Sequence, residues 1–313
     1  MRLLITGANG FVGRALTFEA VARGLMVRAA SRCYSAFPET IECVSVGDID
    51  GNTDWHDALT SCDVVAHLAA RAHVMHDTTT EPFTEFRKVN VDGTLNLARQ
   101  AASAGVKRFV FISSIGVNGA ETFSAPLAVQ DEPAPHSPYA VSKHEAELGL
   151  KALALETGME VVIIRPPIVY GPNAPGNFGS LMRWLSRGLP LPLGAVTLNR
   201  RSLVALDNLV DLILTCLQHP KAANQTFLVS DGDDLSTTEL LQRMGKAMNR
   251  PARLLPVPAS LLFVAARLLG KTAVTQRLLG SLQVDISKTC ELLDWKPPAS
   301  VEEGLRRAVQ QRL

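Results

Sequence analysis

Hydrophobic positions along the first half of the chain follow two alternating patterns. Short apolar runs predict β-strands at residues 2–5, 26–30, 63–68, 108–112 and 160–164. Between them, apolar residues recur at helical spacing, most clearly over 14–22, 91–104 and 136–156. Strands that alternate with helices form parallel sheets covered on both faces. The pattern predicts an α/β protein with a doubly wound parallel sheet.

The pattern changes after Arg165. Proline and glycine pairs interrupt the chain from residue 166 to residue 192, which indicates loops and short elements. We therefore predict a first domain over 1–165 and a smaller second domain over 166–313. Segments near 202–230 are expected to return to the first sheet.

Composition narrows the class of protein. The 313 residues are 47% hydrophobic and 19% charged, as in a globular protein with a sizeable core. The net charge of +1, without a basic block, gives no indication of a nucleic-acid partner. Five scattered cysteines without a CxxC pair predict free thiols in a reducing compartment, so a cytoplasmic protein is expected.

One further apolar segment, SLLFVAARLL at 260–269, is about half as long as a membrane span requires. It also carries Arg267. No membrane span is expected, and we predict a buried helix here, with a weak membrane-surface role as the alternative.

The first predicted strand runs into the glycine-rich turn TGANGFVG at 6–13, which opens the first helix. Gly7, Gly10 and Gly13 permit a tight turn and bring backbone N–H groups toward a pyrophosphate at a helix N-terminus. Its place between strand and helix is the context that a dinucleotide-binding turn needs. The first domain is therefore predicted to bind a dinucleotide.

Tyr139 and Lys143 lie four residues apart, so a helix places them on one face. A tyrosine hydroxyl ionises near pH 10, and a nearby ammonium group should lower that pKa. The pair is predicted to act as a general acid or base.

These motifs resemble the extended short-chain dehydrogenase/reductase family, of the NAD-dependent epimerase/dehydratase type, which includes nucleotide-sugar epimerases, reductases and dehydratases. The resemblance spans nearly the whole chain. It includes HLAA at 67–70, VNVDGT at 89–94, YAVSK at 139–143, VYGP at 169–172, RSLVALDNLVD at 201–211 and DISK at 285–288. It implies a Rossmann-type fold with a smaller C-terminal substrate domain and a homodimer built from helices near 91–104 and 139–156.

The resemblance also implies a set of cofactor-binding residues, NAD or NADP being the cofactor. They are Gly7, Gly10, Phe11, Val12, Gly13, Arg32, Asp48, Ile49, Leu68, Ala69, Ala70, Asn90, Tyr139, Lys143 and Pro166. In this type of fold an acidic residue at the end of the second strand selects NAD, whereas an arginine accommodates the 2′-phosphate of NADP. The strand here ends in Ser31 and Arg32, which together could hold a phosphate, so NADP or dual use is favoured over strict NAD. The alternative is that Arg32 only stacks on the adenine or faces solvent.

By the same resemblance, Ser114 is the hydroxyl that contacts the reacting sugar oxygen, 25 residues before Tyr139. Ser113 is then a supporting residue that contacts cofactor or backbone. Family members that dehydrate a hexose carry an acid and a base directly after this position. Ile115 and Gly116 supply neither, so dehydration is not expected.

The substrate-binding residues implied are Ser114, Tyr139, Asn177, Phe178, Arg201 and Arg277, with Arg201 on the diphosphate of a nucleotide-sugar. Arg277 aligns poorly, and a solvated helix face is the alternative for it. Ile168 replaces a family asparagine, and Leu282 falls where epimerases tune their tolerance for an N-acetyl group. His73 and His76 lack further ligands, so no metal is expected.

We therefore predict an NAD(P)-dependent oxidoreductase acting at C4 of a nucleotide-sugar. The preferred reaction is reduction of a UDP-4-keto-6-deoxy-N-acetylhexosamine to UDP-N-acetylquinovosamine for a bacterial surface polysaccharide, mainly because of Arg32. The alternative is a UDP-hexose 4-epimerase, acting on UDP-glucose or UDP-GlcNAc with tightly bound NAD. A non-catalytic NADP(H) sensor is disfavoured because Tyr139 and Lys143 are both present.

Overall fold

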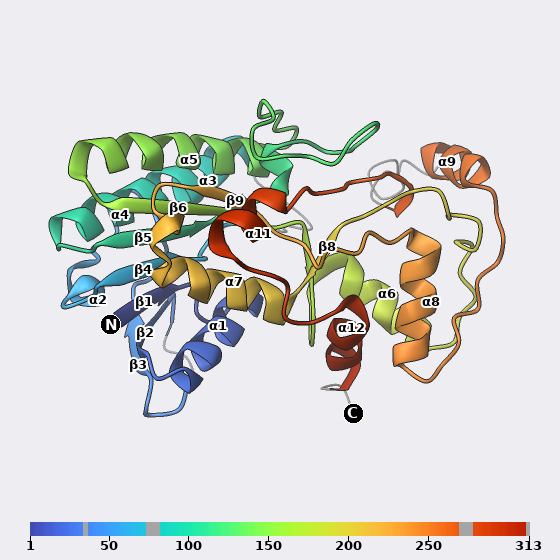
Figure 1. Cartoon of the computed structure of the whole chain (residues 1–313), viewed down its shortest axis with the longest axis horizontal. Helices are drawn as coiled ribbons and strands as arrows, with labels where there is room; N and C mark the ends of the chain where they lie inside the picture. Colours follow the sequence, from blue (N-terminus) through green and yellow to red (C-terminus); the bar gives the residue numbers. More distant parts are fainter. Residues whose placement is uncertain (34–36, 73–81, 269–277, 311–313) are drawn as a thin grey trace.

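A parallel sheet of seven strands forms the centre of the molecule (Figure 1). The structure is a computed structural model and describes residues 1–33, 37–72, 82–268 and 278–310. In spatial order the strands are β3 (Glu42–Ser45), β2 (Met26–Ser31), β1 (Arg2–Thr6), β4 (Val64–His67), β5 (Arg108–Ile112), β6 (Glu160–Arg165) and β9 (Thr226–Leu228). Every neighbouring pair is parallel, which confirms the predicted α/β class.

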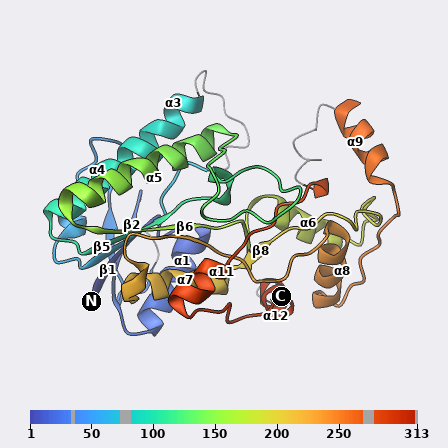
Figure 2. The ribbon, with the colours of Figure 1, turned by 45° about the horizontal axis from the view of Figure 1, so that its top comes forward.

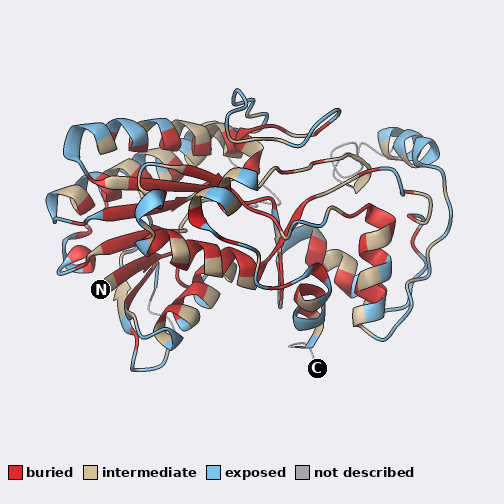
Figure 3. Ribbon diagram, in the orientation of Figure 1, coloured by how far each residue is buried: buried red, intermediate tan, exposed pale blue. Residues whose placement is uncertain are grey.

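Helices cover both faces of this sheet (Figures 1 and 2). On one face lie α4 (Thr94–Ser103) and α5 (Pro138–Thr157), and on the other lie α1 (Phe11–Ala22) and α7 (Leu206–Gln218). Successive strand side chains alternate between the two cores, Leu4 facing α4 and α5 while Leu3 and Ile5 face α1 and α7. Burial is therefore deepest along the strands (Figure 3).

Shorter elements connect this framework. They are α2 (His56–Leu59), α3 (Pro82–Arg87), the π-helix η1 (Lys88–Gly93), the 3₁₀-helices η2 (Ile115–Val117) and η3 (Pro220–Ala222), and α11 (Ser287–Leu293). The five thiols are free, as predicted.

A second lobe follows β6. It contains the small parallel sheet of β7 (Ile168–Tyr170) and β8 (Leu203–Ala205), with α6 (Gly176–Ser186), α8 (Thr237–Ala247), α9 (Ala259–Leu268) and α12 (Val301–Gln310). Tyr170, Phe178 and Leu241 belong to its separate hydrophobic core. The chain also returns to the first lobe, because α7 packs on α1 and β9 extends the large sheet. The domain limits at 165 and 166 stay a prediction.

The apolar segment predicted as a buried helix forms α9, and here the prediction of burial was wrong. None of the residues of α9 is buried, and the helix lies at the outer end of the second lobe (Figures 1 and 3). Leu262 packs against the core of that lobe, but the other faces of the helix are exposed because no described element covers them. Within the described ranges, no helix has the length and apolar character needed to cross a bilayer.

Candidate active site

Most of the predicted site residues follow directly after the strands of the large sheet. Gly7 follows β1, Arg32 follows β2, Leu68 follows β4, Ser114 follows β5 and Pro166 follows β6. All these strands are parallel, so their carboxyl ends meet at one edge of the sheet. The strand order changes direction between β1 and β4, which is where ligands bind in open α/β sheets.

The glycine-rich turn is shaped as a dinucleotide needs. Gly7 has φ of +65°, and a Cβ there would lie 2.8 Å from the backbone nitrogen of Ala69. A Cβ on Gly13 would lie 2.1 Å from the Gly7 carbonyl oxygen, so only glycine permits this approach of helix and turn. Gly10 caps α1 without a side-chain acceptor, and the first turn, which holds Phe11 and Val12, has no acidic residue. These residues fit an anionic pyrophosphate at the start of α1.

A buried threonine holds the loop after β4 against this turn. The Thr6 hydroxyl accepts hydrogen bonds from the backbone N–H groups of Leu68 and Ala69, both at 3.2 Å. Its own proton is then directed to His67 Nδ1 at 2.7 Å, while His67 Nε2 donates to Thr94 Oγ1 at 2.9 Å. Burial, with the nearby charge of Lys143, lowers the pKa of His67 to about 3, so this histidine is neutral and structural.

Asn90, in η1, connects the loop after β4 to helix α5. Its amide oxygen accepts from the Arg71 N–H at 2.8 Å, and its amide nitrogen donates to Ser142 Oγ at 3.0 Å. The side chain is fully buried, so the protein itself uses both ends of the amide. The predicted contact of Asn90 with a cofactor stays a prediction, as does that of Ala70.

Arg32 and Asp48, both predicted at the cofactor ribose and adenine, lie close together at the surface. The Arg32 side chain is 78% exposed, and its guanidinium lies 3.9 Å from the carboxylate of Asp48, which is 93% exposed. Ser31 Oγ donates to the backbone carbonyl of Cys33 at 2.6 Å. Asp48 lies in the loop after β3, where Gly93 allows Ile49 to pack closely. An exposed pair of this kind is weak, so Arg32 stays accessible and the preference for NADP stays a prediction.

Tyr139 and Lys143 lie one turn apart on α5, as their spacing predicts. Ser137 caps this helix, and Pro138 occupies its first turn. The Lys143 ammonium nitrogen donates to the carbonyl oxygen of Ile112 at 2.8 Å and lies 4.3 Å from the centre of the Phe111 ring. Lys143 is therefore anchored to the end of β5, two residues before Ser114.

The electrostatics of this pair differ from the prediction. Burial raises the pKa of Tyr139 to about 12 and lowers the pKa of Lys143 to about 7, although the Glu147 carboxylate opposes the second effect. The expected lowering of the Tyr139 pKa does not arise, because desolvation dominates. Formation of the phenolate at neutral pH thus requires additional positive charge beside Tyr139.

The two serines after β5 have different environments. Ser114 is half-buried, and its hydroxyl accepts from the Gly116 N–H at 3.1 Å. Ser113 is buried, and its hydroxyl donates to the Glu147 carboxylate at 2.5 Å. The Ser113 hydroxyl therefore contacts a side chain of α5 rather than the backbone as predicted, and its supporting role stays a prediction.

Glu147 and Arg165, which adjoin Ser113 and Lys143, were not predicted from the sequence. They form an ion pair in which both side chains are almost fully buried, and Arg165 also donates to Asn118 Oδ1 at 2.8 Å. Glu147 lies one helical turn after Lys143, and this spacing was the signal that could have identified it. The pair joins α5, the end of β6 and the turn that follows Ser114.

Three of the predicted substrate residues, Asn177, Phe178 and Arg201, lie in the second lobe. Arg201 is half-buried and donates to the Gly280 carbonyl at 3.0 Å, while the Phe178 ring is buried 5.3 Å from Tyr170. Asn177 lies in the first turn of α6, but its side chain is outside the described part of the structure. Arg277, His73 and His76 lie outside the described residues. The substrate contacts of all these residues stay predictions.

Leu282 lies closer to the reacting end of the site. It forms an apolar cluster with Ile115, Leu228 and Val284. Ile115 directly follows Ser114, so the cluster forms an apolar wall beside the predicted catalytic hydroxyl.

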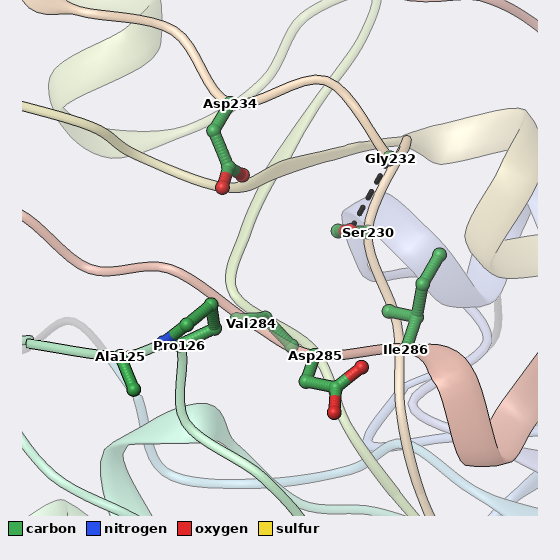
Figure 4. A pocket seen from close by; sticks show the side chains of 8 residues that line it. All are labelled: Ala125, Pro126, Ser230, Gly232, Asp234, Val284, Asp285 and Ile286. Atoms are coloured by element: carbon green, nitrogen blue, oxygen red, sulfur yellow. Dashed lines mark hydrogen bonds between the residues drawn. The ribbon is translucent and has the colours of Figure 1, made fainter.

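A pocket of about 370 Å³ lies among three loop segments around residues 125–126, 230–234 and 284–286 (Figure 4). Its lining residues are Ala125, Pro126, Ser230, Gly232, Asp234, Val284, Asp285 and Ile286. The carboxylates of Asp234 and Asp285 both line it, and they would repel an anionic diphosphate. None of the lining residues is a predicted site residue, and the pocket is poorly suited to the diphosphate of a nucleotide-sugar.

Comparison with known proteins agrees with this geometry. The NAD dependent epimerase/dehydratase family matches residues 3–230. A UDP-glucose 4-epimerase of Vibrio cholerae is 50% identical over 310 residues, covering 98% of this chain and 94% of the relative.

Solved structures share the fold. The UDP-N-acetylglucosamine 4-epimerase of Bacillus cereus has a TM-score of 0.82 at 21% identity, with 99% of each chain covered. The UDP-glucuronic acid 4-epimerase of the same organism, in complex with NAD, has a TM-score of 0.78 at 22% identity, with 99% of this chain and 96% of that chain covered. With the glycine turn, the Tyr139–Lys143 helix and the family match over most of its length, this chain belongs to the NAD-dependent epimerase/dehydratase family of enzymes, within the extended short-chain dehydrogenases/reductases.

Proposed function

We propose that the protein is a UDP-hexose 4-epimerase that uses NAD, with UDP-glucose and UDP-galactose as its first substrate pair. The observation that carries this choice is the 50% identity to a UDP-glucose 4-epimerase along nearly the full length of both chains. It favours the epimerase, which the sequence reasoning placed second, over the reductase.

The proposed roles follow from the positions of the side chains. Tyr139 removes the proton from the C4 hydroxyl and later returns it, while Ser114 holds the C4 oxygen by a hydrogen bond. Lys143, fixed by the Ile112 carbonyl, holds positive charge near Tyr139 when protonated. A bound nicotinamide dinucleotide supplies the acceptor and donor of the C4 hydride.

Epimerisation also requires the keto-sugar to present both of its faces. The wall of Ile115 and Leu282 offers no hydrogen bond that would fix one face of the ring beside Ser114. The same Ile115, followed by Gly116, lacks an acid or base for dehydration. Both features support hydride chemistry with a sugar that is held mainly by its nucleotide, for which Arg201 is the proposed diphosphate ligand.

The reductase is the second candidate, because Arg32 still lies after β2 and Ile168 replaces a polar family residue. It would consume NADPH while reducing a UDP-4-keto-6-deoxy-N-acetylhexosamine. The 50% identity to a UDP-glucose 4-epimerase favours the epimerase instead.

Incubation of the purified protein with UDP-glucose, without added cofactor, tests the proposal. We expect UDP-galactose to form, as followed by proton NMR, and no product with Tyr139→Phe. Consumption of NADPH with the 4-keto sugar, together with no conversion of UDP-glucose, would establish the reductase instead.

A further inference from the structure

Helix α9 carries two apolar stripes on opposite sides. Leu262 and Ala266, four residues apart, are the half-buried positions, and Leu262 packs on the core of the second lobe. Leu261, Val264 and Leu268 form a second stripe with helical spacing, and all three are more than half exposed. A helix that is apolar on both sides is normally enclosed by protein or lipid, and neither described neighbours nor polar side chains cover this outer stripe.

The stretch of sequence that contains the helix is basic. Residues 240–284 contain seven basic residues and no acidic residue, although the whole chain has a net charge of only +1. Arg243 is paired with Asp233 and Glu302, and Lys271 and Arg277 lie outside the described residues. Arg267 lies on α9 itself, and Arg253 lies on the segment that leads into it. Both are exposed, and neither forms an ion pair with a described residue. Basic side chains beside an exposed apolar stripe are the composition of helices that lie in the interface of an anionic membrane.

A second copy of this chain is a poorer partner for the same surface. Symmetrical pairing of α9 with itself would bring two basic stretches of sequence together. An anionic lipid surface instead neutralises these charges and covers the outer stripe. The exposed Phe263 adds an aromatic side chain of the kind that membrane interfaces favour.

We propose that α9 is a docking helix that binds reversibly to anionic phospholipid membranes. Its outer stripe of Leu261, Val264 and Leu268 enters the interface, while Arg267 and Arg253 contact lipid phosphates. A single short helix gives weak binding that depends on salt and on anionic lipid. The docking surface lies outside the catalytic residues, so it is independent of the epimerase assignment.

Vesicle co-sedimentation of the full chain tests this inference. We compare vesicles of phosphatidylcholine with vesicles that also contain phosphatidylglycerol, at low and high salt. Wild type should sediment with the anionic vesicles at low salt and dissociate at high salt. Val264→Glu should reduce the bound fraction by about tenfold, because it places a carboxylate in the apolar stripe.

Met26→Glu is the matched control. Met26 is 55% exposed at the start of β2 and Val264 is 57% exposed, so both variants add one charge at an apolar surface position. Arg267→Ala, which keeps the apolar stripe, should weaken binding to anionic vesicles. Circular dichroism and thermal unfolding without vesicles check that each variant is folded.

Absence of wild-type binding to anionic vesicles overturns the proposal, as does equal loss of binding in Val264→Glu and Met26→Glu. A different outcome is that wild type fails to bind vesicles while light scattering shows that Val264→Glu dissociates an oligomer. In that case α9 binds a second copy of the chain and the proposal fails. None of these results depends on whether UDP-glucose is the substrate.

Discussion

At the residue scale, the proposed chemistry rests on Tyr139 and Ser114. Tyr139→Phe keeps the ring but removes the group that exchanges the proton, so kcat should fall by about 10²- to 10⁴-fold. Ser114→Ala removes one hydrogen bond to the reacting oxygen and should lower kcat by roughly 10- to 100-fold. Cofactor binding, measured by fluorescence titration, should be unchanged in Ser114→Ala, whereas Tyr139→Phe removes one predicted cofactor contact and should weaken binding only modestly. Wild-type activity in Tyr139→Phe would refute the assignment.

Lys143 gives a prediction about stability and pH. Its pKa is about 7 in the folded protein, against an ordinary value of 10.5. Between these values the unfolded chain holds a proton that the folded chain lacks, so this lysine makes the stability rise with pH across that window. Below pH 7 both states hold the proton, and the cost of the buried charge is fully present.

Lys143→Met removes that cost. It should raise the free energy of unfolding at pH 7 by about 1 to 3 kcal/mol, once loss of the bond to Ile112 is allowed for, while abolishing activity. The advantage should shrink as the pH rises toward 10. Urea unfolding at several pH values measures it, and a constant difference across that range would show that Lys143 is not desolvated as described.

The residue scale also shows where sequence reasoning stops. The spacing of Tyr139 and Lys143 identified the pair, because helical geometry is local. The sign of the Tyr139 pKa shift was wrong, because it depends on burial by residues that are distant in sequence. The proximity of Asp48 to Arg32 could not be predicted for the same reason, since Asp48 lies in the loop after β3.

At the scale of elements, the ion pair of Glu147 and Arg165 joins α5 to β6 behind the catalytic turn. Arg165→Met leaves a buried, unpaired carboxylate and should cost about 3 to 5 kcal/mol of stability. Arg306→Met, which breaks an exposed pair with Glu303 on α12, should leave the free energy of unfolding nearly unchanged.

The double variant Glu147→Gln/Arg165→Met removes both charges and should recover part of the stability lost in Arg165→Met. Unfolding in guanidinium measures these variants together with Glu147→Gln alone, which completes the double-mutant cycle. If the two substitutions at the buried pair simply add, Glu147 and Arg165 are not energetically coupled.

The hydrophobic pattern predicted most strands and helices of the first lobe, because the strands are continuous apolar runs and the helices repeat their apolar positions over several turns. It missed β3, whose four residues carry little pattern. It also misassigned the environment of α9, because an apolar helix has the same sequence pattern whether protein covers it or not.

At the scale of the whole molecule, the outer surface of α5 bears on the expected homodimer. Leu148 and Leu155 are seven residues apart on that helix and both are exposed, Leu155 by 90%. If α5 forms the subunit interface, Leu155→Lys should produce monomers in light scattering. Leu198→Lys, at an exposed apolar position in the second lobe, should leave the mass unchanged. A monomeric wild type would contradict the homodimer.

Similarity along nearly the whole chain to a UDP-glucose 4-epimerase made the epimerase, and not the reductase, the preferred function. The family could be predicted from motifs at the strand ends, because these positions are shared by all its reactions. The choice between epimerase and reductase depends on whether the cofactor leaves the site, which no single motif encodes.

In the proposed epimerisation, hydride leaves C4 and returns to the same sugar within one site. UDP-glucose carrying deuterium at C4, incubated with the purified protein and excess unlabelled NAD, tests it most directly. We expect UDP-galactose with deuterium fully retained at C4 and none in the free cofactor, as measured by mass spectrometry and NMR. Deuterium in released NADH or NADPH, or no UDP-galactose at all, would contradict it.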